Sequence, residues 1–239
     1  MPLTPDSPLA DFFASRQTKP PAHLGRRYDR AGTFQPEPGN TVVCHLVEGS
    51  ETQRVLAEAR EKYRAMPEAN HLAFTPVSSL HMTLFQGIIE FRRAAAYWPA
   101  GVALDAPIDD MTELMAARLD GLPPQPAFRV SLVRATPIGL VVAGATEADR
   151  QAMQAWRDAL ATRWGYRHPD HTSYAFHITF AYVIDWLPDA ALPRWQDMLD
   201  EVAADIRRRA PVLELVPPAF CAFSDMNHFE ELRVLPVAG

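Results

Sequence analysis

The chain has 239 residues, and 23 Lys and Arg against 29 Asp and Glu give it a net charge of −6. Hydrophobic residues make up 48% and charged residues 22% of the chain, so it is neither a disordered, a collagen-like nor a coiled-coil protein as a whole. The acidic balance also argues against stable non-specific binding of nucleic acid, because such binding depends on many cations meeting phosphates. One large domain or two small ones fit this length.

In chain order, residues 1–39 are rich in proline and polar residues and are predicted to form an extended arm. The β-branched run from Thr41 to Val47 is typical of a buried strand. Apolar side chains recur on one face over 51–66, which predicts a helix. A strand region over 72–89 and a mainly helical stretch over 90–120 complete the first half.

The second half repeats this order. Apolar residues alternate over 128–132 and follow one another over 138–142, so the two segments are predicted to form a hairpin. Thr146 is the expected N-cap of a helix that runs to about Trp164. The remaining predicted elements are a strand over 174–184, a helix over 194–209 and strands over 211–216, 219–223 and 230–235.

Because strand–helix–strand appears twice, the chain is predicted to be an α+β protein. We expect a two-lobed, pseudo-symmetric fold with mainly antiparallel sheets that face a central cleft and with helices outside. The expected boundaries are an arm over 1–39 and one domain over 40–239. Its lobes are expected at roughly 40–125 and 126–239, with an exchange of strands between them allowed.

Nothing in the sequence indicates export or a membrane. The two cysteines, Cys44 and Cys221, are too few for a disulfide scaffold and lack the spacing of metal ligands, so we expect buried, reduced thiols. The chain begins without a basic stretch and an apolar run, and no segment of about 18 apolar residues occurs. We expect a cytoplasmic monomer with no metal, cofactor or membrane partner.

Two segments share the pattern apolar-His-apolar-Thr-apolar, and their histidines are His81 and His177. In a strand, successive side chains point to opposite faces, so each histidine shares a face with the threonine two positions later, Thr83 or Thr179. One imidazole can accept a proton while another donates one, and a hydroxyl can donate a hydrogen bond to an anionic oxygen. Four such groups around one phosphate form a metal-free arrangement for breaking a phosphodiester.

The twin motifs resemble those of the 2H phosphoesterase superfamily, in which two His-x-Ser/Thr motifs face each other across a cleft. The segment from Gly25 to His45 further resembles a microbial branch of that superfamily. The resemblance implies that His81, Thr83, His177 and Thr179 are the catalytic residues. It also implies a metal-independent hydrolase that opens the 2′,3′-cyclic phosphate of a nucleotide or an RNA end. Which histidine is the base and which the acid stays open.

Two alternatives stay open beside this interpretation. The same fold can act on a 2′-5′ or another phosphodiester as a hydrolase or a ligase, and it can also bind nucleotides without turnover. Three residues near the first motif are additional candidates for substrate binding. Arg92 and Arg93 are placed to hold a terminal phosphate, and Phe85, on the His81 face by alternation, is placed to stack on a base. The same alternation assigns Tyr174 and Tyr182 to the core.

Overall fold

The computed structural model describes residues 9–238. One antiparallel sheet of seven strands, in the order β4-β5-β6-β3-β1-β8-β9, runs through the molecule, and a two-stranded sheet joins β2 to β7. The strands are β1 (Gly39–His45), β2 (Leu72–Phe74), β3 (His81–Ile89), β4 (Val130–Thr136), β5 (Gly139–Gly144), β6 (Phe176–Thr179), β7 (Ala181–Val183), β8 (Ala219–Phe223) and β9 (Glu230–Val234). The α+β class and the mainly antiparallel pairing are therefore confirmed.

The two first-half strands of this sheet, β3 and β1, lie side by side between strands of the second half. β6, from the second half, lies between β5 and β3, while β8 and β9 extend the sheet beyond β1. The two motif strands pair directly with each other, so both motifs lie on one sheet. Pseudo-symmetry and the boundaries of the lobes stay predictions.

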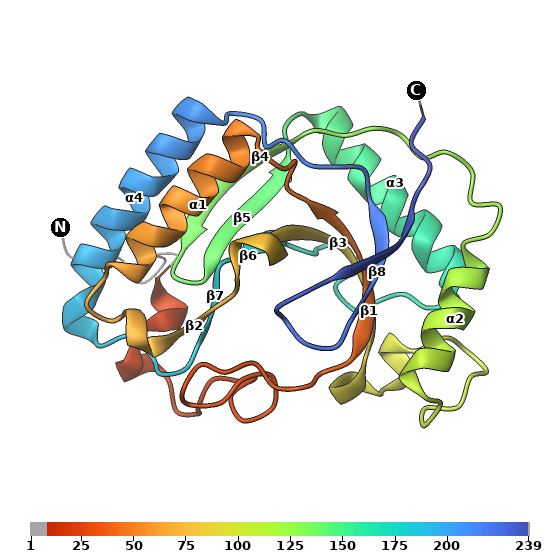
Figure 1. Ribbon diagram of the computed structural model, residues 1–239, viewed down its shortest axis with the longest axis horizontal. Helices are drawn as coiled ribbons and strands as arrows, with labels where there is room; N and C mark the ends of the chain where they lie inside the picture. Colours follow the sequence, from red (N-terminus) through yellow and green to blue (C-terminus); the bar gives the residue numbers. More distant parts are fainter. Residues whose placement is uncertain (1–8, 239) are drawn as a thin grey trace.

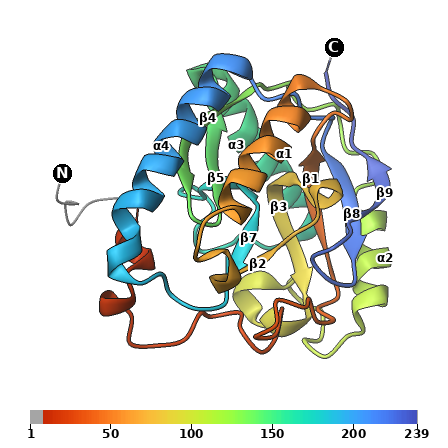
Figure 2. The ribbon, with the colours of Figure 1, turned by 60° about the vertical axis from the view of Figure 1, so that its left-hand side comes forward.

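The α-helices within residues 9–238 cover the outer face of the curved sheet, as predicted (Figure 1). They are α1 (Glu51–Arg64), α2 (Ile108–Arg118), α3 (Glu147–Trp164) and α4 (Leu192–Arg209). α1 and α4 lie side by side at one end of the sheet, and α2 and α3 lie at the other (Figures 1 and 2). The hydroxyl of Thr146 caps α3 and completes a capping box with Asp149, which explains why this helix begins where the sequence indicates.

Two expected elements differ from the structure. The segment 90–120 contains two short 3₁₀ turns, Glu90–Arg92 and Ala95–Tyr97, before α2 begins. Residues 211–216 make only isolated bridges, from Leu213 to Val130 and from Leu215 to Leu46, instead of a strand. The flanking prolines at 211, 217 and 218 have no amide proton, so this segment cannot sustain a continuous ladder.

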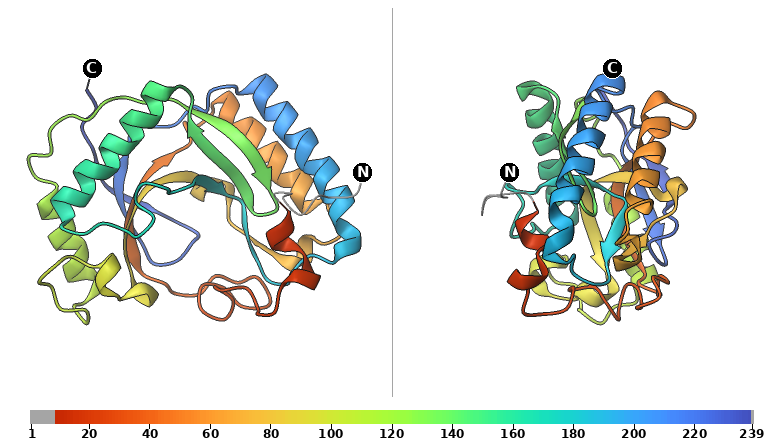
Figure 3. Two further views of the ribbon diagram at one scale, coloured as in Figure 1. Left: turned by 180° about the vertical axis from the view of Figure 1, so that it is seen from behind. Right: turned by 90° about the vertical axis from the view of Figure 1, so that its left-hand side faces the viewer.

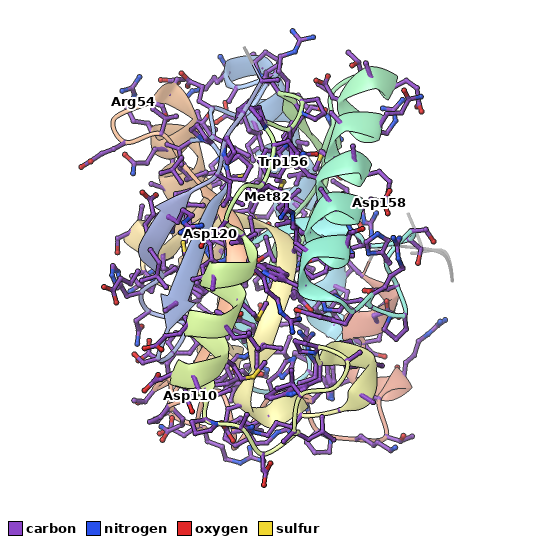
Figure 4. All side chains as sticks on the ribbon, turned by 90° about the vertical axis from the view of Figure 1, so that its right-hand side faces the viewer. Arg54, Met82, Asp110, Asp120, Trp156 and Asp158 are labelled. Carbon is purple, nitrogen blue, oxygen red and sulfur yellow. The ribbon has the colours of Figure 1, made fainter. Side chains whose placement is uncertain are left out.

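The core fills the space between the sheet and the helices. Met82 of β3 and Trp156 of α3 are fully buried, and Trp156 faces the interior while Asp158 lies on the outer side of the same helix (Figure 4). Tight backbone contacts fix the strands near the second motif. Gly139 adopts a φ of +139°, and a Cβ there would lie 2.2 Å from the carbonyl oxygen of Ile178. Only glycine lets the β4–β5 hairpin approach β6 this closely.

The predicted arm packs along the concave side of the sheet over its described part, 9–38; residues 1–8 lie outside the described residues (Figure 3). Leu9 belongs to the main core, and Tyr28 forms a small core of its own with Ala73 and Ile184. The Tyr28 hydroxyl donates a hydrogen bond of 2.6 Å to the carbonyl oxygen of Val183. This packing holds the residues of the arm around Tyr28 against the concave side of the sheet.

Candidate active site

The two motifs lie on neighbouring antiparallel strands. Met82 of β3 pairs with Ile178 of β6, and both side chains are fully buried. Their neighbours in sequence therefore point to the opposite, concave face. In this register His81 lies across from Thr179, and His177 lies across from Thr83. One residue pair thus places all four motif side chains on one surface.

These four side chains line one cleft. Its wall includes the polar side chains of Arg27, Thr41, Thr75, Ser79, Gln86 and Tyr182 and the apolar ones of Ile89, Phe223, Met226 and Phe229. The arm, the motif strands and the β8–β9 connection each contribute to this wall. The cleft is therefore assembled from segments that are far apart in the sequence.

Each motif imidazole is oriented by a carbonyl group two residues earlier. The Nδ1 atom of His81 lies 2.7 Å from the carbonyl oxygen of Ser79, and that of His177 lies 3.1 Å from the carbonyl oxygen of Ala175. A carbonyl oxygen only accepts hydrogen bonds, so Nδ1 carries the proton in both rings. This leaves Nε2 as the basic nitrogen of each neutral ring and as the acidic one after protonation.

Both imidazoles are held neutral in the free protein. Burial lowers the pKa of His81 to about 3, although the bond to Ser79 opposes this shift. Burial also lowers the pKa of His177, and the positive charge of Arg27 adds to the effect. Because a phosphate is anionic, its entry into the cleft favours the protonated form of a neighbouring imidazole.

The two motif threonines keep their hydroxyls available. Within residues 9–238, neither Thr83 nor Thr179 makes a side-chain hydrogen bond. The other two threonines of the cleft are occupied, since Thr41 donates to the carbonyl oxygen of Phe85 and Thr75 bonds to the carbonyl oxygens of Thr179 and Phe180. Thr83 and Thr179 are thus the threonine donors in the cleft that are free to bind an anionic oxygen.

Arg27, from the arm, brings a permanent positive charge to the cleft. Its guanidinium pairs with the buried carboxylate of Glu37 and lies over the ring of Tyr182, 5.1 Å from its centroid. Burial lowers the pKa of Arg27, but Tyr182 and Glu37 outweigh that effect and raise it, so the group stays cationic. Tyr182 itself stacks on Tyr28, with centroids 5.5 Å apart.

The β8–β9 connection supplies an apolar wall beside His81. The ring of Phe229 lies 4.2 Å from that of His81, centroid to centroid, and it also packs against Phe223. Phe223, Met226 and Phe229 form a small hydrophobic cluster with β8 residues. This wall removes water from one side of His81, which is the physical cause of its low pKa.

A family model named 2H-phosphodiest, described as a domain of unknown function (DUF1868), matches residues 27–141. The crystal structure of ATU0111, a conserved protein of unknown function from Agrobacterium tumefaciens str. C58, is similar to this structure. The two chains have 51% sequence identity. The match covers 95% of this chain and 98% of that one, with a TM-score of 0.94. The chain belongs to one family with this Agrobacterium protein, and the match to the family model supports the 2H phosphoesterase superfamily. TT0787 of Thermus thermophilus matches with 18% identity and a TM-score of 0.43 over 81% of this chain and 94% of that one. No curated protein matches.

As in the 2H signature, His81, Thr83, His177 and Thr179 come together, whereas Phe85 does not join them. Phe85 is fully buried and packs against Trp164 and Tyr166. The expectation that Phe85 shares a face with His81 is wrong. A register shift between β1 and β3, where Val42 pairs with Phe85 but Val43 pairs with Thr83, inserts one residue and turns Phe85 into the core.

The two predicted arginines lie outside the wall of the 2H cleft. Arg93 is held by Glu90 and by the carbonyl oxygens of Leu104 and Ala106, so it has no part in the site proposed below. Arg92 bonds to the side chain of Gln86, which does line the cleft. It therefore lies one side chain away from the cleft.

Alternation along the second motif also misplaced Tyr182, which lines the cleft instead of the core. The amides of Phe180 and Ala181 both donate to the carbonyl oxygen of Ile138, so the strand kinks there and its alternation shifts by one residue. Arg27 was missed as well, although it lies in the segment that resembles the microbial 2H branch. Its approach to the motifs depends on the packing of the arm, which local patterns do not encode.

The expected thiol state is also seen, since Cys44 and Cys221 are buried and free. In the part of the chain that the structure describes, no three or more His, Cys, Asp or Glu side chains gather as metal ligands would. None of the helices within residues 9–238 is long and apolar enough to cross a bilayer.

Proposed function

We propose that this 2H phosphoesterase hydrolyses a 2′,3′-cyclic phosphate at a nucleotide or an RNA end, with His81 and His177 as general base and general acid. The observation that supports this most is the pairing of Met82 with Ile178, which brings two imidazoles and two free hydroxyls to one cleft. A cyclic phosphodiester suits these groups, because its hydrolysis needs a base for the attack on phosphorus and an acid for the ribose oxygen that leaves.

Nε2 of His81 takes a proton from a water molecule as its oxygen bonds to phosphorus. Nε2–H of His177 gives a proton to the ribose oxygen as the bond from phosphorus to that oxygen breaks. One proton is taken up and one is released, and the product is a phosphomonoester with a free hydroxyl. We assign the base to His81 because the ring of Phe229 packs against it and favours the neutral imidazole, whose Nε2 accepts a proton.

The remaining groups of the cleft act on the charge of the phosphate. The hydroxyls of Thr83 and Thr179 donate hydrogen bonds to the non-bridging oxygens, whose negative charge grows as the water attacks. Arg27 adds a fixed positive charge beside them. A donor of this kind contributes about 10²–10³ to turnover when it is aimed at the charge of the transition state.

A panel of nucleoside 2′,3′-cyclic phosphates and of 2′-5′ and 3′-5′ oligonucleotides tests this proposal. Products are separated by chromatography, with a metal chelator present throughout. The proposal predicts turnover of the 2′,3′-cyclic phosphates in chelator. Cleavage of 2′-5′ linkages alone would mean that a 2′-5′ phosphodiester is the substrate instead. Loss of activity in chelator would overturn the metal-free mechanism. Binding without product would indicate a nucleotide-binding module instead of an enzyme.

A further inference from the structure

Buried polar atoms without partners gather at one place beside the cleft. Within residues 9–238, the buried side-chain atoms that lack a hydrogen bond are Arg92 Nε, Arg157 Nη2, His168 Nε2, His171 Nδ1 and Tyr174 OH. These five residues belong to one contiguous group, which we call the Arg92–Arg157 cluster. Since buried polar groups are nearly always paired, five unpaired groups in one cluster are unusual.

Ring contacts connect the members of the cluster. The guanidinium of Arg157 lies 4.3 Å from the ring centroid of Tyr174 and 5.4 Å from that of Phe85. The ring of His168 is 4.9 Å from that of Phe85 and 5.2 Å from that of Tyr97, over which Arg92 lies at 4.4 Å. The two guanidinium groups therefore belong to one aromatic-lined setting.

Within the described residues, the two cations of the cluster lack a direct ion pair. Arg157 is 1% exposed, and its hydrogen bonds go to the carbonyl oxygens of His171 and Leu84. Arg92 bonds to the Gln86 side chain and to the carbonyl oxygen of Gly87. Among the described residues, neither guanidinium forms an ion pair with a carboxylate; the nearby Asp158 is bound to His171 and Arg167 instead. Water can satisfy the unpaired donors, but an anion also balances the positive charges of the buried Arg157 and the partly exposed Arg92.

One edge of the cluster lies beside the proposed active site. Arg92, Tyr97 and Tyr174 are partly exposed, whereas Arg157 and His168 lie deeper. The ring of Tyr174 is 6.1 Å from that of His177, centroid to centroid. Its hydroxyl adjoins the Gln86 side chain, which lines the cleft, without forming a hydrogen bond of normal geometry. A ligand at this edge therefore lies beside the reacting phosphate.

We propose that Arg92, Arg157 and Tyr174 bind a second phosphate of the substrate, next to the phosphodiester that is cleaved. This inference rests on the function proposed above and narrows its substrate to a nucleotide that carries a further phosphate. Arg92 Nε and Arg157 Nη2 donate to the phosphate oxygens, as does the hydroxyl of Tyr174. The second phosphate is either a 5′-phosphate on the same nucleoside or the internucleotide phosphate of an RNA end.

Three substrates separate these sources: adenosine 2′,3′-cyclic phosphate, its 5′-phosphorylated form, and a diadenosine with a free 5′-hydroxyl and a terminal 2′,3′-cyclic phosphate. The wild-type protein is expected to show at least about tenfold higher kcat/KM for one of the two substrates that carry two phosphates, and the preferred one identifies the source. Arg92→Met is expected to reduce this preference to within about twofold. Tyr174→Phe removes one hydrogen bond to a charged group and is expected to reduce the preference about tenfold.

Arg54→Met is the matched control, because Arg54 is an exposed arginine of α1 paired with Glu51; it is expected to keep the full preference. No preference in the wild-type protein, or a preference that survives in both Arg92→Met and Tyr174→Phe, would overturn the inference.

Calorimetry tests the second phosphate site without turnover. Adenosine 3′,5′-bisphosphate is expected to bind at least about tenfold more tightly than adenosine 3′-monophosphate, and Arg92→Met is expected to remove this difference. Equal affinities would reject the second site even if cyclic phosphates are hydrolysed, while a difference without hydrolysis would reject only the proposed reaction.

Discussion

Replacing Arg27 separates its two roles, in stability and in turnover. The side chains of Arg27 and Glu37 are 13% and 4% exposed, so Arg27→Met leaves a buried carboxylate without its partner. Breaking a buried pair in this way costs about 3–5 kcal/mol of unfolding free energy. The variant also loses the positive charge of the cleft, and we expect kcat to fall about 10²–10³-fold.

The double variant Arg27→Met/Glu37→Gln isolates the effect on turnover. With neither charge buried, its unfolding free energy is expected to recover to within about 2 kcal/mol of the wild-type value. Its kcat is expected to stay as low as that of Arg27→Met. Chemical denaturation gives the stability, and hydrolysis of adenosine 2′,3′-cyclic phosphate gives kcat. A double variant that turns over within threefold of wild type would refute the role of Arg27, and a fully stable Arg27→Met would refute the buried pair.

Three further predictions concern the histidines. Because burial holds the pKa of both His81 and His177 below 6.5, the plot of kcat/KM against pH is expected to be a bell with its maximum below pH 6.5; a steady rise through pH 8 would contradict this. Burial lowers the pKa of His168 in the folded protein to about 3, so just below pH 6.5 this imidazole takes up a proton only in the unfolded chain. The free energy of unfolding therefore falls as the pH falls. In denaturation series, His168→Gln is expected to reduce this loss by about 1.4 kcal/mol per pH unit between about pH 6 and pH 4, and an unchanged slope would reject a neutral His168. If His177 is the acid, a p-nitrophenyl phosphodiester, whose leaving group needs no proton, is expected to restore turnover in His177→Ala but not in His81→Ala; equal losses on it would reject this assignment.

The sequence predicts the motif strands and most helices, because alternation, periodicity and caps are local signals. Alternation also places His81, Thr83, His177 and Thr179 on two common faces, and the structure joins those faces through a single residue pair. What alternation cannot foresee is an irregularity in a strand.

Two such irregularities change which side chains line the cleft. The register shift near Phe85 sends a predicted base-stacking ring into the core, and the kink at Phe180 brings a predicted core ring, Tyr182, into the cleft. Both depend on partner strands that are distant in sequence. The contribution of Arg27 depends in the same way on the packing of Tyr28 against Ala73 and Ile184. Tertiary contacts of this kind decided which side chains surround the four motif residues.

The most direct test of the two-histidine mechanism is the turnover of a nucleoside 2′,3′-cyclic phosphate by His81→Ala and His177→Ala, measured in chelator. Each imidazole supplies about 10²–10⁴ as a general acid or base, so each variant is expected to lose at least about a hundredfold in kcat. Circular dichroism and denaturation midpoints establish that both variants are folded. Full turnover by either folded variant on a substrate that the wild-type protein hydrolyses would contradict the mechanism.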